Sequence, residues 1–443
     1  MGSKRSEDTA VTGSGPVVRE DMAPAAAAAG ASAAGAAGDY DVIVVGGGMA
    51  GAALAIALDG LGLKLALVEA SPWHADAHPG YDERTLALSW GSRRIFDGLG
   101  VWTAIAAQAT PIRQIDISDR GHIGHARLDA RDQGTPALGY VAAARTIGAA
   151  LIGRLERLAH VTLLCPAELE HLSPGAQHCE VTVRVGEQLR PLRARLVVAA
   201  DGARSRIRTQ LGVPTLEWSY GQTAVTANVT PEHDHGNVAY ERFTEDGPLA
   251  LLPMEGGRCA LVLTVPDAEV EPVLAMPDAQ FQYLVQRRFG LRLGRFVRAG
   301  RRSAHPLKLV KAREHRHGRV AFIGNAAHTL HPIAGQGFNL GLRDVAVLAE
   351  VIADALAADE DPGSSAVLTR YADWRRWDQR ATIGFTDALV RVFANPLPPV
   401  RLARNLGLIG FDLLPPVKRL LVRQLMGVAG RQPRLGLGRA LAG

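Results

Sequence analysis

The stretch Tyr40-Asp-Val-Ile-Val-Val-Gly-Gly-Gly-Met-Ala-Gly51 decides the fold of this chain. Its first half, Tyr40–Val45, is a β-branched apolar run, which predicts a buried strand. The segment after the glycines, Ala52–Gly60, predicts a helix, and Lys64–Glu69 predicts a second strand. A strand, a tight turn, a helix and a strand in this order are typical of a Rossmann-like βαβ unit.

The glycine spacing in this turn is Gly46-x-Gly48-x-x-Gly51. The first glycine permits the bend, the second lets a pyrophosphate approach the backbone, and the third packs helix against strand. At the helix start, Met49 and Ala50 offer free N–H groups and a positive dipole end to phosphates. Glu69 ends the next strand, where a carboxylate binds a ribose hydroxyl pair. We therefore predict an adenine dinucleotide site; the alternative is a glycine-rich surface turn.

A second segment, Arg319–Asp344, also combines a strand, a loop and a helix. Arg319–Ile323 predicts a strand that ends in glycine, and a Pro- and Gly-rich loop then leads to a helix that starts near Gly337–Asn339. The free N–H groups of that helix would lie where negative charge develops on a reduced flavin. The residues of this segment that we expect near the ring are Gly324, Asn325, Pro332, Gly335, Gly337, Phe338 and Asn339.

The sequence of this segment resembles that of a known family. His331-Pro-Ile-Ala-Gly-Gln-Gly-Phe-Asn-Leu-Gly-Leu-Arg-Asp344 is similar to the signature of the ubiquinone-biosynthesis hydroxylases, which are class A FAD-dependent aromatic hydroxylases. The most similar branch hydroxylates 2-polyprenyl-6-methoxyphenols. The resemblance covers most of residues 39–430 and extends to Tyr81–Leu88, Ser118–His122, Leu138–Tyr140, Glu241–Thr244, Gly247–Pro253 and Phe385–Asp387.

The resemblance also implies roles for residues outside the two glycine segments. Asp201 and Gly202 would contact the FAD pyrophosphate and the nicotinamide cofactor, and Arg204 or Arg208 could meet phosphates as forked donors. The alternative for this segment is a turn followed by a basic helix.

Two further arginines are candidates for flavin contacts. Arg84 would pack against the flavin, although a local ion pair with Asp82 or Glu83 is the alternative. Arg145 is a weaker candidate of the same kind. In the wider class an aspartate follows the strand-end glycine; this chain has Asn325, which we interpret as a marker of the branch.

The fold implied by the resemblance is α/β. A Rossmann-like FAD-binding domain of the para-hydroxybenzoate hydroxylase type would carry an inserted antiparallel β-sheet substrate domain and a helical C-terminus. We expect the FAD-binding domain in residues 39–110, 140–217 and 305–355, the substrate domain in 111–139 and 218–304, and the helical region in 356–443. Thr223–Val229, Leu249–Met254 and Arg258–Val265 predict strands of the inserted sheet. Residues 1–38 are rich in Ala, Gly and Ser, so we expect a disordered tail that is not a signal peptide.

The implied activity is hydroxylation of the aromatic ring of a polyprenyl phenol in ubiquinone biosynthesis. FAD, O₂ and transiently bound NAD(P)H would act through a flavin hydroperoxide. The sequence has no second glycine motif of this type after a strand, which agrees with transient nicotinamide binding. No catalytic acid or base is assigned; His331 and Pro332 are loop candidates. A related hydroxylase of a soluble phenol and a non-catalytic flavin-binding scaffold of a biosynthetic complex are the alternatives.

Composition limits the other function classes. The chain has 443 residues, 47% of them hydrophobic, and no apolar run of the about 18 residues that a membrane-spanning helix needs. Its net charge of +5 is far from a nucleic-acid-binding signature. The three cysteines have no CxxC spacing, so we expect a reducing, cytoplasmic compartment and no zinc site. His328 and His331 have no carboxylate partner nearby in sequence, which favours a loop-shaping role over a metal.

One C-terminal segment suggests contact with a lipid surface. Val400–Gly427 alternates basic and apolar residues, which is typical of an interfacial amphipathic helix. A polyprenyl substrate partitions into the bilayer, so we expect the protein to attach peripherally to the inner face of the cytoplasmic membrane. The alternative is a helix pair that packs on the FAD-binding domain. Other ubiquinone-pathway proteins are further expected partners.

Overall fold

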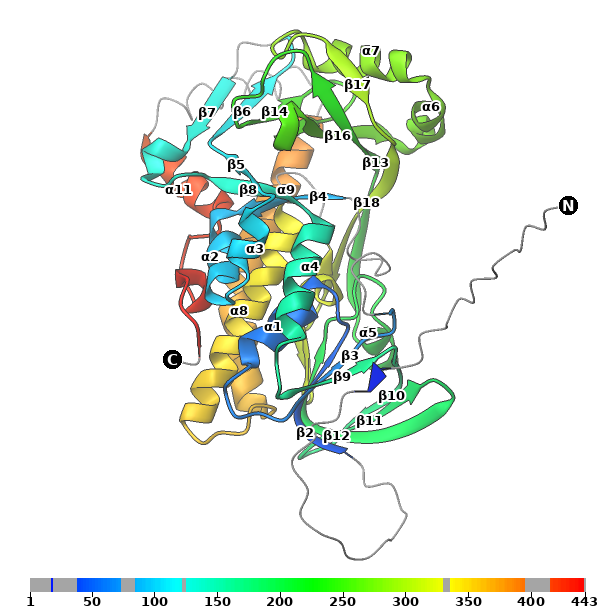
Figure 1. The fold of residues 1–443 in the computed structure, drawn as a ribbon, viewed down its shortest axis with the longest axis vertical. Coiled ribbons are helices and arrows are strands. Elements are labelled where there is room, and N and C mark those ends of the chain that lie inside the picture. The colour runs from blue at the N-terminus through cyan, green and yellow to red at the C-terminus, as the bar shows by residue number, and fades with distance from the viewer. Residues whose placement is uncertain are drawn as a thin grey trace, which may run out of the picture.

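The structure is a computed structural model that describes residues 17–18, 38–72, 84–121, 125–329, 335–394 and 415–441. A mixed sheet with a parallel centre, which we call the parallel sheet, lies at one end of the molecule and a largely antiparallel sheet at the other, with long helices beside them (Figure 1). None of the helices within those ranges is long and apolar enough to cross a bilayer. The α/β class, the inserted antiparallel sheet and the helical C-terminal part are confirmed.

The parallel sheet contains the strands predicted from the glycine segments. β2 (Gly38–Val45) pairs in parallel with β3 (Leu65–Val68) and β12 (Gln188–Ala199). β3 also pairs in parallel with β9 (Val161–Cys165), and β12 with β20 (Val320–Phe322). Antiparallel strands complete the sheet: β1 (Val17–Val18), β10 (Glu168–Pro174), β11 (Cys179–Val185) and β19 (Arg316–His317). β1 pairs with β9 and β2 begins at Gly38, so these three residues of the predicted tail lie in strands; disorder in the rest of residues 1–38 stays a prediction.

Both faces of the parallel sheet are covered, as the unbroken apolar run in β2 requires. Val42 and Val44 face a core that includes α1 (Met49–Leu58), α4 (Ala144–Leu155) and α8 (Gln336–Ala357). Ile43 and Val45 face a second core with residues of β10 and β11. Packing on two sides thus fixes the end of β2, where the glycine turn begins.

The antiparallel sheet is built mainly from the middle of the chain. Its strands are β13 (Thr215–Pro231), β14 (Val238–Phe243), β15 (Leu249–Pro253), β16 (Cys259–Pro266), β17 (Phe296–Ala299), β18 (Ser303–Ala312), β6 (Gln114–Asp119), β7 (His125–Asp129) and β21 (His328–Thr329). The exception to antiparallel pairing is β6 with β14. One face packs on α7 (Asp278–Phe289), close to α6 (Val270–Ala275). The predicted strand Thr223–Val229 lies in the second half of the longer β13.

A small sheet and further helices lie between the two large sheets. The small sheet pairs β8 (Gly139–Ala143) with β4 (Thr85–Ser89) and β5 (Thr110–Ile112). Short α2 (Trp90–Gly98), α3 (Trp102–Ala106) and α5 (Arg206–Gln210) follow strands or turns. α9 (Ser365–Ala394) packs along α8, and α11 (Pro415–Leu425) lies near β7 and β8 (Figure 1).

Candidate functional site

A cavity of about 470 Å³ opens at the carboxyl ends of β2, β3, β12 and β20. We call it the glycine cavity, because Gly46, Gly48, Gly202 and Gly324 line it. Ligands of open α/β sheets bind at this edge of the parallel strands. The candidate residues that line it are Gly46, Gly48, Met49, Ala50, Glu69, Arg84, Asp201, Gly202, Gly324, Asn325, Gly337 and Phe338.

The three glycines of the first turn have different surroundings. A Cβ atom on Gly46 would lie 2.4 Å from the Ala200 carbonyl oxygen, and one on Gly51 would lie 1.8 Å from the Gly46 oxygen. A Cβ on Gly48 would meet no protein atom within 4 Å. Gly46 and Gly51 therefore allow close packing of the protein on itself, whereas Gly48 leaves space beside the cavity.

The start of α1 is free to receive an anion. Gly48 is its N-cap, no side chain caps the helix, and its first turn carries no acidic residue. The positive end of the helix dipole and the first N–H groups thus remain available at the cavity. Glu69 is buried, and its carboxylate accepts hydrogen bonds from the backbone N–H of Gly47 at 2.5 Å and of Ser71 at 2.7 Å. Glu69 therefore holds the glycine turn in place, a role that sequence reasoning missed, and its ribose contact stays a prediction.

In the segment after β12, some polar side chains line the glycine cavity and others bind the protein backbone. Asp201 and Arg204 line the glycine cavity, and burial raises the pKa of the Asp201 carboxyl. The backbone N–H of Ile207 donates to Asp201, which fixes the start of α5. The guanidinium of Arg208 is buried and donates to the carbonyls of Ala326 and Ala203, at 2.9 and 2.8 Å. This geometry therefore argues against the predicted contact of Arg208 with a phosphate.

The second glycine segment brings another helix start to the same place. α8 begins at Gln336, with Gly335 as its N-cap in a left-handed conformation (φ +60°) and no side-chain cap. A Cβ on Gly335 would lie 2.9 Å from the Cβ of Ala87, so the turn packs directly on β4. The predicted helix start near Gly337–Asn339 is confirmed to within a few residues. The loop candidates His331 and Pro332 lie outside the described residues.

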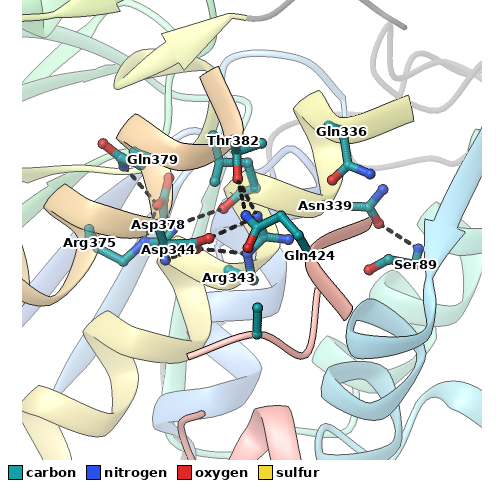
Figure 2. Close-up of polar contacts among 12 residues, drawn as sticks. Ser89, Gln336, Asn339, Arg343, Asp344, Arg375, Asp378, Gln379, Thr382 and Gln424 are labelled. Atoms are coloured by element: carbon teal, nitrogen blue, oxygen red, sulfur yellow. Dashed lines mark hydrogen bonds and ion pairs between the residues drawn. The ribbon is translucent and has the colours of Figure 1, made fainter. Parts of the chain in front are cut away.

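Asn339 has a structural role that its sequence position did not indicate. Its amide oxygen accepts from the Ser89 N–H at 2.8 Å and from the Ser92 hydroxyl at 2.7 Å. Its amide nitrogen donates to the carbonyls of Ala87 and Gly335, at 2.9 and 2.6 Å. The side chain is thus fully engaged in attaching α8 to β4 and α2, as its contact with Ser89 in Figure 2 illustrates.

The two candidate arginines are placed differently. Arg84 lines the glycine cavity. Arg145, at the start of α4, instead lines a separate cavity of about 110 Å³, together with Asn228 and Arg258. Of the described candidates, Gly51, Arg145 and Arg208 line neither the glycine cavity nor the cavity that adjoins it.

A second large cavity, of about 430 Å³, adjoins the first, and Gly337 and Phe338 line both. We call it the apolar cavity. Side chains from β6, β7, β14, β15 and β16 form one wall, and β4, the start of α8 and α11 form the others. Its lining is mainly aliphatic: Leu86, Leu88, Ile112, Ile115, Ile117, Leu128, Leu138, Leu252, Val262, Leu421, Val422, Leu425 and Met426. Such a cavity suits a hydrophobic ligand next to whatever occupies the glycine cavity.

A buried charge network supports the start of α8 from behind. Asp344 accepts hydrogen bonds from the Gly324 N–H at 3.1 Å, from Arg375 Nε at 2.7 Å and from Gln379 at 3.1 Å, and pairs with His328 Nε2 at 2.6 Å. Figure 2 shows Arg375, Asp378 and Gln379 of α9 reaching toward α8. Burial alone would raise the pKa of Asp344, but His328 and Arg375 hold it well below its ordinary value. His328 therefore shapes this segment, and no His, Cys, Asp and Glu group in the described ranges could hold a metal ion.

The two helix starts and the open space at Gly48 fit FAD. Its pyrophosphate needs a close approach to the backbone, which Gly48 allows, and its ring system needs a flat space that reaches a substrate, which the junction at Gly337 and Phe338 offers. The two residues that line both cavities, Gly337 and Phe338, are uncharged, so the protein would act between the cavities mainly through backbone N–H groups.

Comparison with known proteins agrees with this geometry. Residues 39–385 match the family model described as "FAD binding domain". The chain is 38% identical to ubiquinone hydroxylase UbiL of Rhodospirillum rubrum over 89% of the chain and 91% of that protein. It is 35% identical to 3-demethoxyubiquinol 3-hydroxylase of Escherichia coli, over 86% and 97%. The solved p-nitrophenol 4-monooxygenase PnpA of Pseudomonas putida shares the fold, with a TM-score of 0.72 at 20% identity over 89% of this chain and 100% of that one.

Proposed function

The chain belongs to the FAD-binding domain family, among its ubiquinone hydroxylases, and from this premise we propose that it hydroxylates the ring of a polyprenyl phenol. It is an FAD-dependent aromatic-ring monooxygenase of ubiquinone biosynthesis. When bound, FAD would supply the chemistry, namely hydride acceptance from NAD(P)H and activation of O₂ for transfer of one oxygen atom to the ring. The protein positions the ring and excludes water.

The main support for a hydrophobic substrate is the apolar cavity next to the glycine cavity. Its wall belongs to the antiparallel sheet, and its lining offers almost only hydrocarbon to a ligand. A cavity of about 430 Å³ holds a substituted ring and the first part of a prenyl chain. The rest of a longer prenyl chain would extend out of the cavity. Helix α11 forms part of the cavity wall: Leu421 and Leu425 line the cavity, and Leu420 is 70% exposed on the outside.

The proposed FAD contacts follow the two helix starts. Gly46–Gly51 and Met49–Ala50 at the start of α1 would hold the pyrophosphate, and Glu69 the ribose. Asp201, Gly202 and Arg84 line the same cavity and would contact the remaining polar parts. Gly324 and Asn325, with the start of α8 at Gly337 and Phe338, would face the ring.

The test of this proposal is product formation with a short-chain 2-prenyl-6-methoxyphenol. We expect the FAD-loaded protein to oxidise NAD(P)H and to yield a product with one added oxygen atom, labelled when the gas is ¹⁸O₂. Methoxyphenol without the prenyl group serves as the comparison substrate. Equal turnover of both phenols would point to a soluble-phenol hydroxylase, and NAD(P)H oxidation without labelled product would contradict the proposal.

We further propose that α11 contacts the inner face of the cytoplasmic membrane. Leu420 and the basic residues Arg419 and Arg423 are exposed on this helix, next to the cavity wall. Exposed apolar and basic residues on one short helix suit an anionic lipid surface. The rest of the predicted segment Val400–Gly427, residues 400–414, lies outside the described residues.

Charge reversal on α11 gives a direct prediction. We expect the variant Leu420→Glu with Arg419→Glu and Arg423→Glu to lose binding to anionic liposomes by at least about tenfold, because each basic residue contributes about 1 kcal/mol near such a surface. Co-sedimentation with the liposomes measures this. The control is Leu189→Glu in β12, which removes another exposed leucine (61% exposed) far from the cavity wall. Equal liposome binding by wild type and triple variant would contradict the membrane contact.

A further inference from the structure

One carboxyl group lies in the middle of the apolar wall. In the register of the antiparallel sheet, Glu241 of β14 pairs with Ile117 of β6 and Ala250 of β15. Ile117 pairs in turn with Ala126, and Ala250 with Val262. The row across five strands is therefore apolar except at its centre, and each of its residues lines the apolar cavity.

The strand alternation directs this side chain into the cavity. Ala239, Glu241 and Phe243 line the cavity, as residues two apart on one face of a strand should. Tyr240 also borders it, but its ring packs edge-on against Phe289 of α7, on the other side of the sheet. Arg242 likewise turns away and donates to the Arg288 carbonyl and the Ser118 hydroxyl.

Within the described part of the chain, the Glu241 carboxyl has no hydrogen bond or ion pair. The other lining residues with polar side chains are neutral, namely Thr85, Ser89, Tyr240, Gln336 and Asn339. No charged side chain of β4, β6, β7, β15, β16, α8 or α11 lines the cavity beside it. Burial in these surroundings raises the pKa of Glu241 to about 8. An unpartnered carboxyl in an apolar wall is costly to the fold, which favours a role toward a ligand.

We propose that Glu241 is the catalytic residue that receives the phenol hydroxyl of the substrate and accepts its proton. This inference rests on the proposed function, because it assigns the polar anchor of the same cavity. In the step, the phenol O–H bond breaks and an O–H bond forms on Glu241 Oε; the electron pair stays on the phenolate oxygen. The phenolate then donates electron density to the ring carbon that receives oxygen.

The electrostatics of the site suit this transfer. A phenol such as tyrosine has a pKa of about 10, so an ordinary glutamate, near 4.3, would be a poor acceptor. Because the pKa of Glu241 is raised to about 8, it lies much closer to the pKa of a phenol. The ionised form of Glu241 increases as the pH rises toward about 8, so the rate of hydroxylation should increase over the same range.

Two substitutions separate the proton transfer from binding. Glu241→Gln keeps the shape but cannot accept a proton, and we expect hydroxylation of the prenyl methoxyphenol to fall roughly 100-fold and to lose its rise with pH toward 8. Glu241→Leu removes the polar anchor. The FAD-loaded wild type should bind the phenol at least about tenfold more tightly than its O-methyl ether, whereas Glu241→Leu should not discriminate between them. Flavin absorbance changes report this binding.

The matched control is Glu180→Gln in β11, an exposed strand glutamate outside both cavities, which should leave rate and pH profile unchanged. An unchanged rate in Glu241→Gln, or a retained preference for the phenol in Glu241→Leu, would overturn the inference. If the wild type binds the phenol selectively but forms no hydroxylated product, the proposed function fails while the binding role of Glu241 stands. Flavin content and circular dichroism show whether each variant is folded.

Discussion

Replacement of Gly51 by alanine is expected to yield protein that retains no FAD on purification. The new Cβ atom would lie 1.8 Å from the Gly46 carbonyl oxygen, which belongs to the backbone and cannot rotate away. Overpacked contacts cost about 1–3 kcal/mol even where side chains can move. Helix α1 must therefore move away from β2, which displaces the helix start that would hold the pyrophosphate. Flavin absorbance at a fixed protein concentration measures the loss.

Two other glycines make this experiment selective. Gly48 has φ −59° and no protein atom within 4 Å of an added Cβ, so Gly48→Ala should fold normally and weaken only the binding of FAD. Gly153 in α4 has equally open surroundings, and Gly153→Ala should keep FAD and gain up to about 1 kcal/mol in stability. Full flavin content in Gly51→Ala would show that the turn tolerates the atom and that our assignment of its packing role is wrong.

The parts of the site that could be predicted from sequence are those determined by residues close together in the chain. The turn at Gly46–Gly51 follows from a strand, a spacing and a helix that are consecutive in the chain. The start of α8 near Gly337 follows from glycine and proline content. The sequence pattern is less informative for β13, because the exposed residues Leu216–Ser219 break its apolar alternation and pairing with β18 holds them in the strand.

Roles that depend on distant partners could not be predicted. Asn339 was a natural cofactor candidate, but its amide is used by Ser89 and Ala87, some 250 residues earlier in the chain. Glu241 belongs to a stretch that supported the family resemblance, yet only the pairing of β14 with β6 and β15 shows that its neighbours are all apolar. Register between strands brings Glu241 and its neighbours together, and no local period of the sequence encodes that register.

The charge network behind α8 leads to the second large effect. Asp344 is fully buried and Arg375 is 2% exposed, so the ion pair between them, at 2.7 Å, is shielded from water. Removing one partner of a buried pair leaves the other charge uncompensated, at a cost of about 3–5 kcal/mol. We therefore expect Asp344→Asn to lower the free energy of unfolding of the FAD-loaded protein by about this amount, measured by urea denaturation.

The same helix offers the control. Arg376 and Asp373 of α9 form an ion pair at 2.5 Å with both side chains more than half exposed, and Asp373→Asn should cost no more than about 1 kcal/mol. Adding Arg375→Met to Asp344→Asn should cost far less than the two single changes summed, because the double variant no longer buries the Arg375 charge with Asp378 as its one remaining carboxylate partner. Asp344 also accepts the Gly324 N–H at the end of β20, so Asp344→Asn should release FAD more readily than Asp373→Asn does. Equal losses of stability in the two aspartate variants would mean that the buried network does not support the cofactor end of α8.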